Sequence, residues 1–191
     1  LGLRSFGIHG CRLLRDGRPW TVAGCYDTSV TAAPWHAWRE SRMARVVVDP
    51  SEHICEEASE EGVMLIAELR GTSPDLLVRE VHRLGKWAAV VMIIVDPSAA
   101  GGLSLRARAP NVLLAEHVVE RAQPVLSNGT HVGVYDVSES GCVPQCLAAG
   151  TIPWIVRRRL ASAVPLEEAV DQSRRLYEEY VPNGACLGCL A

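Results

Sequence analysis

Residues 89–96 read AVVMIIVD, an apolar run that ends in a carboxylate and is followed by Pro97. An apolar run with no alternating polar face is typical of a strand in a parallel sheet that is covered on both faces. Seven further runs follow the same scheme, and most of them end in a charged residue: TVAGCYD (21–27), ARVVVD (44–49), VMLIAEL (63–69), NVLLAEHV (111–118), HVGVYDV (131–137), TIPWIVRR (151–158) and ACLGCLA (185–191). Eight strands separated by helical or loop segments predict a closed (β/α)8 barrel, in which chemistry gathers where the strands end.

The length of the chain limits this barrel to a compact form. Its 191 residues, 48% of them hydrophobic, are enough for one full core, whereas barrels of this type typically have about 250 residues. We therefore predict a single α/β domain over residues 1–191, a TIM barrel in which several helices are shortened to a turn or two. Residues 1–20 are expected to form an N-terminal β-hairpin and residues 21–191 the barrel itself.

Turn and capping residues define the elements between the runs. Asp16-Gly17 is a strong hairpin signal, and the hairpin is expected to close the N-terminal mouth of the barrel. Ser51 caps a predicted helix that Gly62 ends, and Ser73-Pro74 opens another with proline at its first position. The clearest amphipathic helix spans residues 166–180. Shorter helices are predicted over 33–43, 119–127 and 138–149, and a loop or one irregular turn over 97–110.

Composition and charge exclude several classes of protein. The net charge of −3 is spread over mixed signs, so no nucleic-acid partner is expected. No apolar stretch reaches the roughly 20 residues of a membrane span. Neither a glycine-rich phosphate loop nor a Gly-x-Ser-x-Gly elbow occurs, and we expect no cofactor. Seven cysteines, an odd number in a chain of this size, and the lack of a signal peptide predict reduced thiols and a cytoplasmic location.

Two pairs of cysteines have the spacing of metal ligands, namely Cys142-x3-Cys146 and Cys186-x2-Cys189. The second pair lies on a predicted strand, where side chains three residues apart point to opposite faces. The histidines are scattered and complete no ligand set. We therefore expect no metal site.

The first third of the chain carries the motifs of a known family. Asp16-Gly17-Arg18-Pro19 is followed by an apolar strand and Gly24. Ala44-Arg45 and Asp49-Pro50 come next, then an acidic helix, Gly62 and a strand that reaches Glu68. These motifs resemble the catalytic barrel of glycoside hydrolase family 2, the β-galactosidase and β-glucuronidase group. The resemblance implies a (β/α)8 barrel that acts on O-glycosyl bonds.

The catalytic positions of that family are occupied differently in this chain. The family places its general acid in an Asn-Glu pair at the end of the fourth strand, where this chain has Val95-Asp96. Its nucleophile, a Glu that ends the seventh strand, is replaced by Arg157-Arg158-Arg159, and its second-strand His falls on Val48. Double displacement needs two carboxyl groups about 5–5.5 Å apart. The family's mechanism is therefore not expected here.

Other charged residues follow the predicted strands at the same end of the barrel. Asp96, Glu116 and Glu68 are the candidate catalytic residues, because carboxylates that converge on one mouth raise one another's pKa values and can keep an acid protonated. In a more ordinary interpretation, charged residues at strand ends cap helices and pair with nearby arginines. The candidate ligand-binding residues are Asp27, Asp49, Asp136, Arg157 and Arg158.

Alternation along the strands predicts which of these side chains enter the barrel. If Leu65 and Ala67 pack against helices, Glu68 points inward. On the fifth strand, Glu116 and His117 compete for the inward position. A buried carboxylate needs a partner, and the candidates are Arg45 and the arginines of 157–159.

Two functions remain open at this point. The one that we favour is a non-catalytic or ligand-binding barrel, because substrate pockets in this fold are built by long loops and those expected here are short. The alternative is a glycosidase with relocated carboxylates at Asp96, Glu116 and Glu68. In both cases the expected partner is a carbohydrate or another small molecule at the C-terminal mouth of the barrel.

Shortened helices also predict a homo-oligomer, because the barrel surface that they leave uncovered exposes apolar side chains. We expect the sedimentation coefficient to rise with protein concentration. Sedimentation velocity at two concentrations tests this expectation, and a monomer at both concentrations would contradict it.

Overall fold

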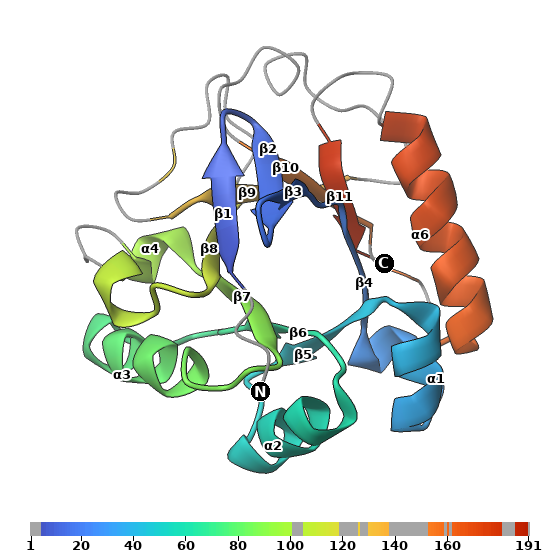
Figure 1. Ribbon diagram of the computed structural model, residues 1–191, viewed down its shortest axis with the longest axis horizontal. Coiled ribbons are helices and arrows are strands. Elements are labelled where there is room, and N and C mark those ends of the chain that lie inside the picture. The colour runs from blue at the N-terminus through green and yellow to red at the C-terminus, as the bar shows by residue number, and fades with distance from the viewer. Residues whose placement is uncertain are drawn as a thin grey trace.

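Eight parallel strands close into a barrel in the computed structural model of the chain (Figure 1), which describes residues 5–100, 105–118, 126, 130–137, 153–158, 160, 162–180 and 186–190. Neighbours around the barrel are neighbours in sequence, and the last strand pairs with the first. Each strand falls within one of the eight predicted runs, so the predicted (β/α)8 fold class is confirmed. The strands are β4 (Val22–Tyr26), β5 (Ala44–Val48), β6 (Leu65–Glu68), β7 (Val90–Val95), β8 (Leu113–Val118), β9 (Val132–Asp136), β10 (Trp154–Arg157) and β11 (Cys186–Leu190).

The N-terminal segment forms an antiparallel sheet that lies across one end of the barrel (Figure 1). Asp16 and Gly17 have φ values of 52° and 74°, the left-handed conformation that a two-residue hairpin turn requires. Arg15 contacts Met64 just before β6, so the sheet covers the N-terminal mouth, as expected. Leu13 is buried in the inner core of the barrel. The sheet has one strand more than the predicted hairpin: β1 (Phe6–His9), β2 (Arg12–Arg15) and β3 (Arg18–Pro19).

Two of the helices on the outside of the barrel (Figure 1) agree with the predicted signals: α2 (Glu52–Glu61) begins after Ser51 and ends at Gly62, and α3 (Pro74–Leu84) begins after Ser73. Ser51 accepts a hydrogen bond from the backbone of Ile54 at the start of its helix, and Gly62 ends that helix in the left-handed conformation. The described part of the stretch 97–110 contains a four-residue helix and one 3-10 turn. The helices predicted over 119–127 and 138–149 fall almost entirely outside the described residues. The described elements are α1 (Trp35–Ser41), α2 (Glu52–Glu61), α3 (Pro74–Leu84), α4 (Pro97–Ala100) and α6 (Leu166–Tyr180), with 3-10 turns η1 (Asp27–Ser29) and η2 (Arg106–Arg108).

Alternate side chains of each strand serve two different cores. Ile66 of β6 packs inside the barrel with Ile94 and Leu113, whereas Leu65 and Ala67 of the same strand pack outward in the core that includes helix α3. The inner core is apolar along most of its length. At the C-terminal mouth the last inward positions of five strands are polar, and these residues are Tyr26, Glu68, His117, Asp136 and Arg157.

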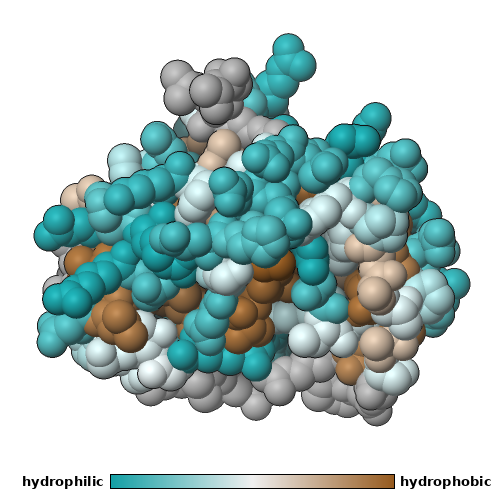
Figure 2. Space-filling model, turned by 90° about the horizontal axis from the view of Figure 1, so that it is seen from below, coloured by the Kyte–Doolittle hydropathy of each residue, from teal (hydrophilic) through white to brown (hydrophobic). Residues whose placement is uncertain are grey.

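The outer surface offers little apolar area on the face shown in Figure 2, where hydrophobic side chains form small groups among hydrophilic ones. Within the described part of the chain, Leu76 of α3 is the one large hydrophobic side chain that is exposed. No described helix is long and apolar enough to cross a membrane. The homo-oligomer stays a prediction.

Gly133 of β9 lies against the ring of Trp154, its partner in β10. A Cβ atom added to Gly133 would lie 1.9 Å from the nearest ring carbon of Trp154. The ring is buried in the outer core with Tyr135 and Leu176, so it cannot move aside without repacking its neighbours. The close approach of β9 and Trp154 therefore requires glycine at this position.

We predict that Gly133→Ala lowers the free energy of unfolding by about 2–3 kcal/mol, because the added methyl group overpacks the outer core. Urea denaturation followed by circular dichroism measures the change. The control is Gly7→Ala, where nothing lies within 4 Å of the added atom and the change should stay within about 0.5 kcal/mol. Equal stabilities of the two variants would show that the Trp154 packing is not as tight as described.

Candidate functional site

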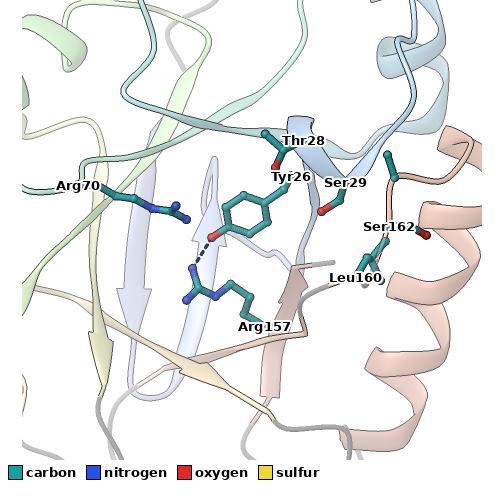
Figure 3. A pocket seen from close by; sticks show the side chains of 8 residues that line it. Tyr26, Thr28, Ser29, Arg70, Arg157, Leu160 and Ser162 are labelled. Carbon is teal, nitrogen blue, oxygen red and sulfur yellow. Dashed lines mark hydrogen bonds between the residues drawn. The ribbon is translucent and has the colours of Figure 1, made fainter.

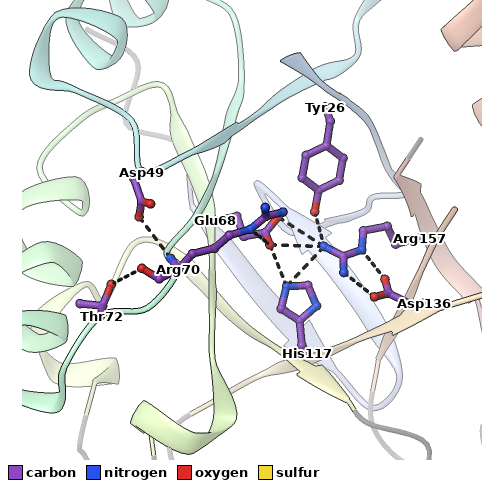
Figure 4. A network of polar contacts seen from close by, with 8 residues as sticks. All are labelled: Tyr26, Asp49, Glu68, Arg70, Thr72, His117, Asp136 and Arg157. Carbon is purple, nitrogen blue, oxygen red and sulfur yellow. Dashed lines mark hydrogen bonds and ion pairs between the residues drawn. The ribbon is translucent and has the colours of Figure 1, made fainter. Parts of the chain in front are cut away.

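Polar side chains from five strands meet inside the C-terminal mouth of the barrel, as Figure 4 shows. Parallel strands place their C-terminal ends on one rim, and the inward parity of each strand decides which side chain reaches the centre. Glu68 and Arg157 lie deepest, and both side chains are 3% exposed. They come from β6 and β10, on different sides of the barrel.

The carboxylate of Glu68 has donors on several sides. Its Oε1 accepts a hydrogen bond from Arg70 Nε at 2.8 Å and lies 3.2 Å from His117 Nε2. Its Oε2 lies 3.3 Å from Arg157 Nη1. A buried carboxylate needs this number of partners to compensate for the water that it has lost.

Arg157 completes the network on the other side. Its Nη1 donates to the Tyr26 hydroxyl at 2.7 Å, and its Nε and Nη2 both donate to the carboxylate of Asp136. This is the two-pronged geometry that makes arginine a strong partner for a carboxylate. The guanidinium is therefore held between two carboxylates, Glu68 and Asp136.

The pKa values follow from these contacts. Burial acts to raise the pKa of Glu68, but hydrogen bonds from His117, Arg70 and Tyr26 and the charge of Arg157 outweigh it and hold that pKa well below its usual value. Burial raises the pKa of the Tyr26 hydroxyl, and the charge of Arg157 only partly offsets it. Glu68 is thus ionised and Tyr26 is neutral at neutral pH.

The segment after β6 positions Arg70 at the rim of this network. The backbone N–H of Arg70 donates to Asp49 Oδ1 at 3.2 Å, and Thr72 Oγ1 donates to the Arg70 carbonyl at 3.3 Å. Asp49 itself has a left-handed φ of 45° and donates its N–H to the carbonyl of Glu68. Asp49 therefore has a local structural role beside the network.

An open cavity of about 290 Å³ lies against this network (Figure 3). Its described lining includes the guanidinium groups of Arg70 and Arg157 and the hydroxyl group of Tyr26. The rest of the described lining comes from the turn after β4 and from the segment that follows β10: Thr28, Ser29, Leu160, Ser162 and Ala163. The cavity is polar. The aromatic residue in its described lining is Tyr26, whose hydroxyl accepts a hydrogen bond from Arg157.

The three candidate catalytic carboxylates have different surroundings in the structure. Glu68 is at the centre, and the prediction that it points inward agrees with its contacts. Asp96 is exposed and accepts hydrogen bonds from the backbone and hydroxyl of Ser98, which lower its pKa and cap α4. His117 takes the inward position on β8, so the buried Glu116 lies on the outward side of the same strand.

The candidate ligand-binding residues divide in the same way. Asp136 and Arg157 belong to the network. Asp27 instead binds Arg45 at 2.7 Å, and the guanidinium of Arg45 lies over the rings of Trp35 and Trp38 on the outer side of the barrel. The interpretation of Arg45 as a partner for an inward carboxylate is therefore wrong. Arg158 points outward to Glu179 of α6, because it follows Arg157 by one residue.

Two residues of the site were missed in the sequence. Tyr26 shares the inward parity of Val22 and Gly24 on β4, and this parity was a usable signal. Arg70 lies two residues beyond the end of β6, where strand alternation no longer applies. Its place depends on Asp49, which belongs to a different loop.

We predict that Glu68→Gln lowers the free energy of unfolding at pH 7 by about 3 kcal/mol, because Arg157 and Arg70 lose a buried charged partner. The folded pKa of Glu68 lies below its usual value of 4.5, so its ionic contribution is complete above that pH and is lost as the pH falls. The difference in free energy of unfolding between wild type and variant should therefore become smaller as the pH is lowered to about 3.

Urea denaturation at both pH values measures this effect. Glu60→Gln on the exposed side of α2 is the control and should change stability by less than about 0.5 kcal/mol. A difference for Glu68→Gln that stays constant with pH would contradict the ionic role of Glu68.

No protein-family model matches this sequence, and no curated protein sequence matches it either. Solved structures do match it. The β-glucuronidase of Bifidobacterium dentium, complexed with coumarin-3-O-glucuronide, matches with a TM-score of 0.63 at 13% sequence identity. The match covers 99% of this chain and 43% of the β-glucuronidase chain. The β-glucuronidase of Ruminococcus gnavus complexed with D-glucaro-d-lactam matches with a TM-score of 0.60 at 13% identity, over 100% of this chain and 46% of the β-glucuronidase chain. The endo-1,4-β-mannanase of Rhizomucor miehei matches with a TM-score of 0.66 at 8% identity, over 97% of this chain and 89% of the mannanase chain.

The chain thus spans less than half the length of these β-glucuronidases and most of the length of the mannanase. At such low sequence identities the likeness establishes the fold alone. The protein shares the TIM-barrel fold of these solved structures.

Proposed function

We propose that this protein is a ligand-binding barrel that holds a small polar molecule, of the carbohydrate class, in the cavity at its C-terminal mouth. The observation that carries the proposal is the position of the cavity above the Glu68–Arg157 network (Figure 3). The network presents fixed hydrogen-bonding groups to one side of the cavity. Groups that are already oriented bind a ligand with little further loss of conformational freedom.

The state of the carboxylates supports binding over hydrolysis. A glycosidase of the two-carboxylate type needs one protonated acid and one accessible carboxylate. Glu68 is ionised and surrounded by donors, and both oxygens of Asp136 accept from Arg157. Neither Glu68 nor Asp136 is therefore set up as the protonated acid or as the accessible carboxylate.

The class of ligand is supported by the neighbouring folds. The solved neighbours are named as β-glucuronidases and as an endo-1,4-β-mannanase, which are enzymes of carbohydrate substrates. In these barrels the C-terminal mouth is where ligands bind. The hydroxyl and guanidinium groups of the cavity suit a polyhydroxylated ligand that accepts several hydrogen bonds.

We predict that the protein releases no chromophore from 4-nitrophenyl β-glycosides above background, and that Glu68→Gln and Asp96→Asn leave this result unchanged. Hydrolysis by the wild type that Glu68→Gln abolishes would favour the alternative, a glycosidase with relocated carboxylates.

Binding is tested separately by isothermal titration with a panel of monosaccharides. Ser29→Phe places a large side chain in the cavity and should abolish binding. Ser73→Phe is the matched control, because Ser73 is exposed and its side chain makes no capping hydrogen bond to α3. The proposal fails if no sugar binds, or if Ser29→Phe binds as well as Ser73→Phe.

A further inference from the structure

The described charged residues that line the cavity at the C-terminal mouth are all of one sign. Its charged lining residues among the described part of the chain are both arginines, Arg70 and Arg157. The carboxylates that neutralise them, Glu68 and Asp136, do not belong to that lining. The positive groups of the ion pairs therefore line the cavity, whereas their carboxylates do not.

Arg70 has unused donors toward the cavity. Its Nε is bound to Glu68, which fixes the plane of the guanidinium, while its two terminal nitrogens make no hydrogen bond within the described residues. The side chain is 53% exposed and reaches toward the cavity from the segment after β6 (Figure 3). A guanidinium held through Nε presents a planar fork that matches the two oxygens of an oxyanion.

Hydroxyl groups line the side of the cavity near η1. Thr28 and Ser29 come from η1, and Ser162 comes from the segment after β10. Backbone hydrogen bonds from Val164 N to the Ser29 carbonyl and from Thr31 N to the Val164 carbonyl tie these two segments together. In Figure 3 the Ser29 hydroxyl is directed toward Tyr26, whereas the Ser162 hydroxyl is directed away from Tyr26 and Arg157.

We propose that the ligand carries an oxyanion, a carboxylate or a phosphate, that binds to the terminal nitrogens of Arg70. This inference rests on the proposed function, because it names the chemical group that the same cavity selects. Arg157 adds positive charge but no free donor, since its nitrogens already bind Tyr26, Glu68 and Asp136. Glu68 acts as a positioning residue that orients Arg70.

The experiment compares matched neutral and acidic sugars by isothermal titration. The carboxylate arm uses galactose and galacturonate, and the phosphate arm uses glucose and glucose 6-phosphate. We expect the acidic member of at least one pair to bind about ten-fold more tightly or better, because its hydrogen bonds are charge-assisted. The arm with the larger ratio identifies which oxyanion the site prefers.

Variants and salt assign the effect to the proposed residues. Arg70→Gln should bring the acidic and neutral sugars to similar affinities. Arg79→Gln is the control, because Arg79 is exposed on α3 outside the cavity. Raising the salt from about 0.05 M to about 0.5 M should weaken only the acidic ligand.

Equal affinities of the acidic and neutral members would overturn this inference while leaving the proposed function intact. A preference for the acid that survives Arg70→Gln would overturn the assignment to Arg70. No binding of any of the four sugars would reject the proposed function and the inference together.

Discussion

The ion pair between Glu68 and Arg157 is the interaction on which the mouth of the barrel depends. Both side chains are almost completely buried, so neither charge is solvated by water, and each must find its partners inside the protein. Removing one of them would take away a main partner of the other's buried charge, which is strongly destabilising. Tyr26, His117 and Asp136 are therefore held in place by the same requirement.

This constraint limits the chemistry that the site can perform. A carboxylate that is surrounded by donors stays ionised, and it is unsuited to act as a general acid at neutral pH. Arg157, at the end of the seventh strand, compensates the charges of Glu68 and Asp136. The apolar interior below it belongs to the stability of the fold, whereas the mouth above it carries the groups that can meet a ligand.

Charged residues on the outer side of the barrel are also paired with one another. Asp27 and Arg45 form an ion pair there, with the guanidinium of Arg45 over the ring of Trp35. Arg158 forms an ion pair with Glu179 of α6. Charged residues at neighbouring sequence positions thus divide between two environments according to strand parity. Asp49 and Asp96 take a third role, since both accept hydrogen bonds from nearby backbone N–H groups.

The sequence alone determined the number and places of the strands, because buried parallel strands need continuous apolar runs with turn residues between them. It also indicated the inward direction of Glu68 through its apolar neighbours Leu65 and Ala67. Only the tertiary structure decided between Glu116 and His117, and it alone brought Arg70 beside Glu68. Those outcomes depend on the register of strands far apart in the chain and on contacts between separate loops, which no local pattern of residues contains.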